Sequence, residues 1–330
     1  MEIIKMDYAI HSQQFIGLFK EVFKKDIDAN YLNWKFINTP EGKAIGYGAW
    51  ENGELVGSVA LWPVRFVVAG KEIVACAGGD TMVSETQRGK GLFTMLSREL
   101  FKEISGNNWA FRYSIPGPMS FPGYIKKLNH SHIMDLPYYV KFNVKALFHY
   151  AVKSKKLFSQ YDYRGYSVSI ENTIPPDHDS LLEKTADRFT LMQKRNGDYM
   201  RWRFERNPVN KYSYLSCRHN GNMMGYIVLA RNVVADILAV NNVDVYVALL
   251  KAADAYFAGM GEPYQHIWCA GDDQLESSLL KNGWSTPDED KKWHLKKQPL
   301  IVMVNDTVKE SAAALDKKAW RFTMADVDFI

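Results

Sequence analysis

The sequence predicts an α/β protein of two tandem domains, each with a mixed, mostly antiparallel sheet flanked by helices. Three observations predict this. A chain of 330 residues is too long for one compact core of usual size. Helical and strand-like hydrophobic periods alternate along it, and the second half repeats the order of the first. We expect a first domain at 1–145, a connection at 146–185 and a second domain at 186–330.

Each element of the first half has its own signal. Apolar residues at helical spacing share one face in the segments 11–38 and 90–105. The pair Asn52-Gly53 is a strong turn signal between two strands. In chain order, the first half is expected to contain helical segments covering roughly 11–38, strands at 44–50, 55–64 and 74–83, a helix at 90–105, a strand at 111–115, a helix at 121–128 and strands near 132–144.

A gap-free repeat relates two stretches of 27 residues that lie 168 positions apart. The eight identical pairs are Tyr31/Tyr199, Trp34/Trp202, Phe36/Phe204, Pro40/Pro208, Lys43/Lys211, Asn52/Asn220, Gly53/Gly221 and Gly57/Gly225. Because Trp34 and Trp202 occur in both copies, a shared packing role is expected for them. Farther along, Asp80 has a counterpart in Asp236, but nothing near Asp236 resembles the glycine-rich segment 88–93. The second half is therefore expected to be a degenerate copy of the first.

The composition is that of a globular protein, and it argues against several classes. A net charge of +4 is too small to indicate nucleic-acid binding. The three cysteines are odd in number and far apart, which indicates buried thiols and no metal site. The chain begins without the pattern of a signal peptide, and no run of about 18 apolar residues occurs. We expect a cytoplasmic protein without a membrane partner.

The segment 88–93, Arg-Gly-Lys-Gly-Leu-Phe, follows an expected strand and begins an expected helix. Ser84 stands where a Walker loop requires glycine, and Gly91 stands where it requires serine or threonine. Thr94 stands where a dinucleotide fingerprint requires its third glycine. Backbone N–H groups of a glycine turn at a helix N-terminus still surround an anion well, and Arg88 adds a positive charge. The segment therefore predicts a pyrophosphate-binding turn, with an ordinary turn as the alternative.

This segment resembles the acetyl-CoA-binding motif of the GCN5-related N-acetyltransferase (GNAT) superfamily, Arg/Gln-x-x-Gly-x-Gly/Ala. Arg88, Gly91 and Phe93 occupy its three named places, and Phe93 departs from the small residue usual in the last. The order of elements is also similar, and Asn129 stands where the family has glycine. The resemblance implies acyl-CoA as co-substrate, either acetyl-CoA or a short-chain acyl-CoA, and no metal. The implied cofactor-binding residues are Met82, Val83, Arg88, Gly89, Lys90, Gly91, Leu92 and Phe93.

The resemblance also implies direct attack of an amine on the thioester. The Val83 N–H would donate to the thioester carbonyl, and a donor of this kind contributes about 3–4 kcal/mol. Asp80 on the same strand is the candidate general base. The alternative is that Asp80 only caps a bulge after Gly78-Gly79. Glu85 is a second candidate base, although it follows the strand and is expected to be solvated.

Tyr124 is the candidate general acid, because the family has a tyrosine near this place in the helix after the splayed strand. A tyrosine of the core is the alternative. His130 is a further candidate proton carrier, as is His132. These two histidines share a strand face by their spacing, but no third ligand is near them, so metal binding is not expected.

Together these features predict an acyl-CoA-dependent N-acyltransferase that moves an acetyl or short hydroxyacyl group to a primary amine. Tandem copies resemble the bacterial sugar N-acyltransferases of the superfamily, which implies a nucleotide-linked amino sugar as acceptor. The acyl-CoA site is expected within 1–145, and the second domain is expected to complete the acceptor cleft. A non-catalytic module that binds acyl-CoA or a nucleotide is one alternative, and an aminoacyltransferase on a doubled fold is another. Neither a nucleic-acid nor a membrane partner is expected, and a homo-oligomer stays open.

Overall fold

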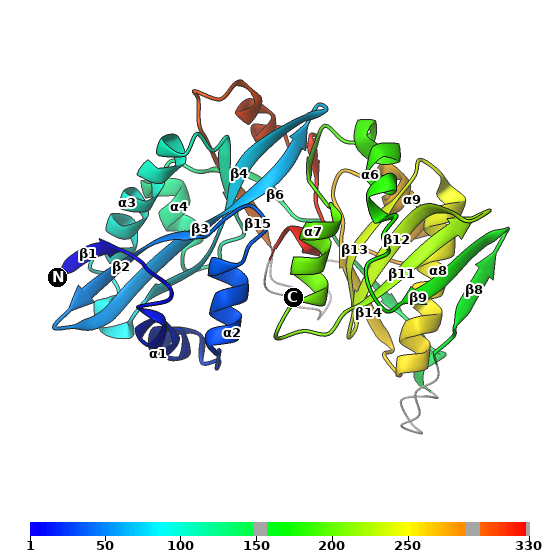
Figure 1. Ribbon diagram of the computed structural model, residues 1–330, viewed down its shortest axis with the longest axis horizontal. Coiled ribbons are helices and arrows are strands. Elements are labelled where there is room, and N and C mark those ends of the chain that lie inside the picture. The colour runs from blue at the N-terminus through cyan, green and yellow to red at the C-terminus, as the bar shows by residue number, and fades with distance from the viewer. Residues whose placement is uncertain (148–156, 288–297, 328–330) are drawn as a thin grey trace. The chain divides into compact units, whose positions relative to one another are not determined.

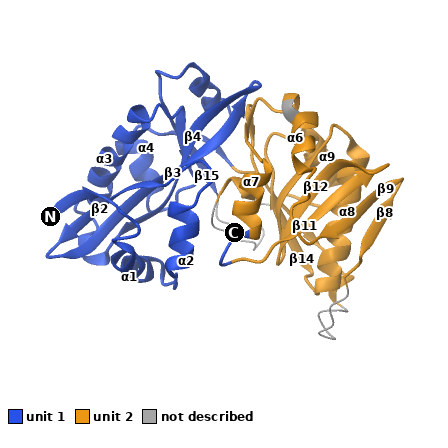
Figure 2. Cartoon of the chain, viewed as in Figure 1, with its two compact units in different colours: residues 1–135, 206–209, 298–317 blue, residues 136–205, 210–297, 318–330 orange. Residues whose placement is uncertain are grey.

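The structure is a computed structural model that describes residues 1–147, 157–287 and 298–327. Its chain forms two compact units (Figures 1 and 2). Unit 1 comprises residues 1–135, 206–209 and 298–317, and unit 2 comprises residues 136–205, 210–297 and 318–330. Each unit contains a mostly antiparallel sheet flanked by helices, which confirms the predicted fold class. No helix within the described residues is long and apolar enough to cross a membrane.

Unit 1 is built on a sheet with the strand order β1-β2-β3-β4-β5-β15-β6. Its strands are β1 (Glu2–Lys5), β2 (Ile45–Glu51), β3 (Glu54–Val68), β4 (Lys71–Val83), β5 (Phe111–Ser114), β6 (Ser131–Asp135) and β15 (Pro299–Val304). Its helices are α1 (Ser12–Phe23), α2 (Ala29–Leu32), the π-helix η1 (Asn33–Ile37), η2 (Glu85–Gln87), α3 (Leu92–Gly106), α4 (Phe121–Lys127) and η5 (Lys309–Leu315). Only β4 and β5 pair in parallel in this series. The elements expected between 11 and 128 are therefore present in the expected order.

The two faces of this sheet carry different helices. The α3 face is a core of aliphatic residues, in which Leu92, Leu96 and Leu100 of α3 pack against Val59 and Leu61 of β3. Helices α1 and α2 lie on the other side of the sheet from α3 and α4 (Figure 1). Their side is aromatic: the rings of Tyr8, Phe15 and Phe36 contact one another, and Phe36 contacts Trp62 of β3. Because Leu61 and Trp62 are neighbours on a strand, their side chains point to opposite faces of the sheet, and each belongs to a different core.

Unit 2 has the strand order β7-β14-β13-β12-β11-β9-β8, again with one parallel pair, β13 with β14. Its strands are β7 (Tyr138–Phe142), β8 (Gln160–Tyr163), β9 (Tyr166–Glu171), β11 (Ser213–His219), β12 (Asn222–Ala230), β13 (Val233–Ala239) and β14 (Tyr264–Trp268). The strands β10 (Leu191–Gln193) and β16 (Trp320–Arg321) pair in parallel and lie outside this order. Its helices are α6 (His178–Thr185), η3 (Ala186–Arg188), α7 (Gly197–Met200), the π-helix η4 (Arg201–Glu205), α8 (Val243–Met260), α9 (Asp273–Lys281) and η6 (Met324–Asp326). The long helix α8 supplies much of the core.

Each unit contains a strand from the other half of the sequence. Strand β15 lies between β5 and β6 in unit 1, and β7 pairs with β14 in unit 2. The expected domains, 1–145, 146–185 and 186–330, differ from this division. The segment 146–185 is not a simple connection, because β8 and β9 extend the second sheet and α6 also lies in it; its residues 148–156 lie outside the described residues. The hydrophobic period of a segment indicates that it forms a strand but not which sheet the strand joins. The placement of β7 and β15 was therefore not predicted.

The repeated segment has the same local structure in both units. In each, a four-residue α-helix continues into a five-residue π-helix, first as α2 and η1 and later as α7 and η4. Trp34 and Trp202 are both buried, as a shared packing role requires. Lys35 and Arg203 stand at matching places in the two π-helices and are also buried. The repeat therefore gives each unit a buried cation on a π-helix.

Candidate active site

Strand β4 has a β-bulge at the position of the predicted general base. The pairing of β3 with β4 shifts between Ser58 and Ala60, so that Asp80 and Thr81 together stand opposite one residue of β3. Asp80 has a left-handed backbone with a φ of 45°, which aspartate tolerates better than most residues. A bulge bends its strand and re-aims the side chains next to it. The bulge that the sequence raised as the alternative for Asp80 is thus present, and it decides where this carboxylate points.

The Asp80 carboxylate meets a buried lysine. Lys35 Nζ lies 2.5 Å from Asp80 Oδ2 and donates to the Tyr31 hydroxyl at 3.0 Å. The side chain of Lys35 is 2% exposed and that of Asp80 13% exposed. Lys35 Nζ also lies 5.2–5.7 Å from the ring centres of Tyr31, Phe36 and Trp62. The ion pair therefore sits among aromatic rings, where little water competes for either charge.

Thr81, the second residue of the bulge, contacts the predicted general acid. The hydroxyl groups of Thr81 and Tyr124 are 3.1 Å apart. Tyr124 lies on α4, is buried, and packs edge-on against Phe93 of α3 at a ring distance of 5.0 Å. The side chain of Asp80 contacts η1 and that of Thr81 contacts α4, so the two side chains point to opposite sides of β4 (Figure 1). The carboxylate of the candidate base thus points to the η1 side of β4, whereas the candidate acid lies on the α4 side.

His130 has a different setting from that of a proton carrier. Its Nδ1 is 2.7 Å from the Leu128 carbonyl oxygen and its Nε2 is 2.6 Å from an Arg112 guanidinium nitrogen. The guanidinium group can only donate, so Nε2 accepts and the Nδ1–H donates to Leu128. Burial, together with the charge of Arg112, lowers the pKa of His130 to about 3. His130 is therefore neutral near pH 7, with both nitrogens engaged, and the structure favours a role in holding Arg112.

Arg112 is a functional-site neighbour that the sequence did not single out. Its side chain is 2% exposed, and its guanidinium carbon lies 4.5 Å from the ring centre of Tyr124. A Cβ at Gly78 would lie 2.4 Å from an Arg112 guanidinium nitrogen, so glycine leaves the space this side chain crosses. His130 contacts Arg112, and Arg112 in turn lies against the ring of Tyr124. These two residues therefore hold the candidate acid in place. Its signal in the sequence was weak, because an arginine inside a short apolar strand has no partner nearby in the chain.

The backbone of β4 opens toward β5 beyond the bulge. Of the described residues, Cys76 and Ala77 pair with β5, and the Ser114 hydroxyl donates to the Gly78 carbonyl oxygen at 2.8 Å. Farther along, the Ser84 N–H donates to Val56 of β3 at 2.9 Å. Successive N–H groups of a strand point to opposite edges, so the Val83 N–H points to the β5 edge, where the strands diverge. This orientation suits the predicted donor to a thioester carbonyl.

The predicted pyrophosphate turn has the backbone that an anion site requires. Gly89 and Gly91 have φ values of 78° and 81°, and no atom lies within 4 Å of a Cβ placed on either. Glycine is required here for its conformation, not for space. Gly91 caps α3, whose first N–H groups, beginning at Leu92, lack carbonyl partners within the helix. Lys90 Nζ donates to Gln87 at 3.2 Å, which holds it beside the turn.

Phe93, the residue that departs from the motif, is explained by α4. A Cβ at Gly123 would lie 2.7 Å from the Phe93 ring. Phe93 therefore packs directly on the glycine backbone of α4, next to Tyr124. A large residue at 93 and a glycine at 123 compensate each other. Asn129, which stands where the family has glycine, has the left-handed backbone that glycine adopts readily, with a φ of 51°.

Two other predicted candidates are exposed. Glu85 is solvated, as expected, with its side chain 3.7 Å from Arg88. His132 contacts Asp135 at 3.1 Å on β6. Among the described residues there is no group of three or more His, Cys, Asp or Glu that could hold a metal ion. Cys76, Cys217 and Cys269 are free and buried.

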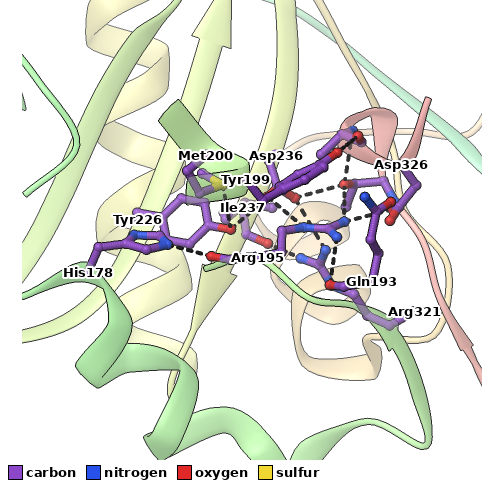
Figure 3. A network of polar contacts seen from close by, with 12 residues as sticks. His178, Gln193, Arg195, Tyr199, Met200, Tyr226, Asp236, Ile237, Arg321 and Asp326 are labelled. Carbon is purple, nitrogen blue, oxygen red and sulfur yellow. Dashed lines mark hydrogen bonds and ion pairs between the residues drawn. The ribbon is translucent and has the colours of Figure 1, made fainter. Parts of the chain in front are cut away.

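In unit 2, the counterpart of Asp80 is part of a closed network (Figure 3). Asp236 forms an ion pair with Arg195 at 2.9 Å and accepts hydrogen bonds from Arg321 at 3.2 Å and from the hydroxyls of Tyr226 and Thr323 at 2.6 and 2.7 Å. Burial alone would raise the pKa of Asp236, but the two arginines outweigh it and lower the pKa to about 2. Both carboxylate oxygens of Asp236 thus accept hydrogen bonds, and its side chain is 0% exposed. Asp236 has a structural role.

The C-terminal segment of the chain covers the edge of β13 where a ligand arm would pair. Strands β13 and β14 pair in parallel at Val233 and Val234 only, among the described residues. Beyond them, Arg321 donates to the Ile237 carbonyl oxygen, and Phe322 exchanges backbone hydrogen bonds of 3.0 Å with Ala270. A Cβ at Gly271 would lie 1.9 Å from the Trp320 carbonyl oxygen, so the segment passes over this glycine. In unit 2 the chain itself fills the place between the diverging strands.

Comparison with known families and structures is consistent with this geometry. Residues 9–128 match the family model described as an acetyltransferase (GNAT) domain. No curated protein sequence matches the chain significantly.

Solved structures share the fold across most of the chain. A probable N-acyltransferase from Enterococcus faecalis V583 is 14% identical, with a TM-score of 0.63 over 92% of this chain and 72% of that one. A GCN5-related N-acetyltransferase from Anabaena variabilis is 10% identical, with a TM-score of 0.64 over 92% and 73%. The N-myristoyltransferase of Saccharomyces cerevisiae, solved with bound myristoyl-CoA and inhibitors, is 14% identical, with a TM-score of 0.59 over 91% and 79%. At these identities the likeness shows the fold, which is that of the GNAT proteins.

Proposed function

We propose that this protein is an acyl-CoA-dependent N-acyltransferase whose acyl-CoA site belongs to unit 1. The observation that carries the proposal is the arrangement of β4 and α3. The left-handed glycines 89 and 91 open the N-terminus of a 15-residue helix, and the strand before them diverges from β5. An anion site and a free strand edge thus adjoin, as the pyrophosphate and the pantetheine arm of CoA require.

The cofactor residues have distinct roles in this proposal. The backbone N–H groups of Gly89 to Phe93 bind the pyrophosphate, and Arg88 and Lys90 add positive charge. The arm of the cofactor pairs with β4 near Met82 and Val83. The Val83 N–H then donates to the thioester carbonyl oxygen and stabilises the negative charge that develops there.

The reaction is a direct transfer. The neutral amine of the acceptor attacks the thioester carbon, a C–N bond forms and the C–S bond breaks. Asp80 takes the proton that leaves the nitrogen, directly or through a water molecule. The Tyr124 hydroxyl gives a proton to the departing thiolate of CoA. The Asp80 carboxylate and the Tyr124 hydroxyl lie on different sides of β4, which supports separate proton transfers for the amine and the thiolate.

The acceptor and the acyl group are the finer part of the proposal. We favour a primary amine on a nucleotide-linked amino sugar and a short acyl group, with unit 2 contributing to acceptor recognition and the protein acting in the cytoplasm. Because Asp236 is enclosed by two arginines and two hydroxyl groups and the segment 320–322 fills the edge of β13, we propose one acyl-CoA site per chain.

The test is a thiol-release assay with acyl-CoAs from acetyl to myristoyl, since a protein of the same fold was solved with myristoyl-CoA. Each is paired with nucleotide-linked amino sugars and with simpler primary amines. We expect acceptor-dependent release of CoA that Asp80→Asn lowers about 10²–10⁴-fold. Asp26→Asn, which removes an 81% exposed carboxylate from the same unit, is the matched control and should leave the rate unchanged. Binding of CoA without turnover of any amine would identify a non-catalytic module instead.

A further inference from the structure

We propose that Lys35 is a positioning residue for acyl transfer, which fixes the direction of the Asp80 carboxylate within the bulge. This inference rests on the proposed function, in which Asp80 takes the proton of the acceptor amine. Lys35 lies 45 positions from Asp80 in the sequence, and no motif connects the two. The structure brings them together through the π-helix η1.

The π-helix η1 sets the direction of the Lys35 side chain. Lys35 is the third residue of η1, whose widened turns extend from Asn33 to Ile37. Trp34 and Phe36 on either side of it are buried, so the helix cannot rotate without exposing an aromatic ring. The lysine stem is held in the core, and its ammonium group emerges beside β4. Single turns of π-helix are frequent at functional sites, where they redirect one side chain.

The surroundings of Lys35 Nζ limit the directions that the Asp80 carboxylate can take. The Tyr31 hydroxyl accepts one of its hydrogens at 3.0 Å and Asp80 Oδ2 accepts another at 2.5 Å. The rings of Tyr31, Phe36 and Trp62 line the rest. An ammonium group held from several sides pulls one carboxylate oxygen to a fixed point. The left-handed backbone of Asp80 is then maintained by its side chain as well as by the strand pairing.

In unit 2, the residues that match Lys35 and Asp80 have different partners. Arg203, which matches Lys35, donates to the Val327 carbonyl oxygen and to the Tyr212 hydroxyl. Asp236, which matches Asp80, accepts from other cations and is fully enclosed. In unit 1 the pair is direct, and the Asp80 side chain keeps 13% exposure. At this matched position, the carboxylate of unit 1 is both paired and partly exposed, whereas that of unit 2 is paired but fully buried.

The experiment compares Lys35→Met, which removes the charge at similar volume, with Lys35→Arg, which keeps it. We expect Lys35→Met to lower kcat at least about tenfold while the KM for acyl-CoA stays within twofold, because the base is misplaced but the cofactor site is not. Lys35→Arg should recover most of this loss. The double variant Lys35→Met with Asp80→Asn should be no slower than Asp80→Asn alone, since the lysine acts through the aspartate.

Lys20→Met is the matched control, because Lys20 forms an exposed ion pair with Asp26 at 2.7 Å in the same unit and should leave kcat unchanged. Thermal unfolding with and without CoA shows whether each variant is folded. If Lys35→Met does not fold, Lys35→Arg decides: a folded Arg variant with near wild-type kcat supports the inference, and one as slow as Asp80→Asn contradicts it.

A kcat of Lys35→Met within twofold of wild type would overturn the inference, and so would losses that multiply in the double variant. The two proposals fail separately. If wild type turns over no amine, the proposed function fails. If Asp80→Asn is slow but Lys35→Met is not, only the role of Lys35 fails.

Discussion

Gly91→Ala separates the conformational role of the glycine turn from its role in binding. Gly91 has a φ of 81° and open space around its Cβ position, so the substitution acts through the backbone alone. A left-handed alanine costs about 1–2 kcal/mol, and the stiffer unfolded chain offsets about 0.4–1 kcal/mol of this. We therefore expect a loss of about 1 kcal/mol in the free energy of unfolding. Relief of the strain would also move the first N–H groups of α3.

Gly53→Ala is a closely matched control. Gly53 also has a φ of 81° and open space, but it lies in the turn between β2 and β3. Both variants should lose similar stability by thermal unfolding. Only Gly91→Ala should weaken CoA binding in isothermal titration, by roughly 10–100-fold, because a hydrogen bond to a charged phosphate contributes about 1.5–3 kcal/mol. Equal CoA affinity in the two variants would refute the placement of the pyrophosphate at this turn.

Tyr124→Phe should lower kcat about 10-fold or more without unfolding unit 1, since it removes only a hydroxyl; an unchanged kcat would remove Tyr124 from the mechanism. Burial lowers the pKa of His130 to about 3 and that of His266 to about 4, so the unfolded chain takes up protons that the folded chain does not between pH 6.5 and these values. The contribution of these histidines to the free energy of unfolding is fully present above pH 6.5 and is lost as the pH falls toward 4. In urea unfolding, the free energy of unfolding of His130→Asn should therefore fall less over this range than that of the wild type. Asp236→Asn should cost about 3–5 kcal/mol by thermal unfolding, because two buried arginines lose their shared carboxylate, whereas Asp198→Asn at a surface pair should have little effect.

Local features of the fold could be predicted from the sequence because they depend on neighbouring residues. The Asn52-Gly53 turn, the glycines of the segment 88–93 and the left-handed Asn129 each follow from the backbone preferences of a single residue type. The helical and strand periods likewise gave the order of elements in unit 1. These are the features for which a short window of sequence contains the whole physical cause.

Features that depend on long-range pairing could not be predicted. The bulge at Asp80 is a property of the register between two long strands. The Lys35–Asp80 pair depends on a π-helix, for which the sequence contains no strong signal. Phe93 was unexplained until Gly123 was found against its ring. The one hint was the repeat itself, because a basic residue stands at both 35 and 203 between a tryptophan and a phenylalanine.

The exchanged strands have the same explanation. Strands β7 and β15 belong to the sheets of the opposite halves of the chain, and their apolar patterns fit either sheet. Which sheet a strand joins is decided by edge pairing, not by its own composition. A domain boundary drawn at one point in the sequence therefore misses both strands.

The most direct test of the central claim is isothermal titration of the wild-type protein with acetyl-CoA. We expect saturable binding at one site per chain, because unit 1 has the glycine turn and the open strand edge and the described part of unit 2 has neither. Gly91→Ala should weaken this one binding event. No heat and no thermal stabilisation at millimolar acetyl-CoA would contradict the claim, because a ligand that prefers the folded state must stabilise it.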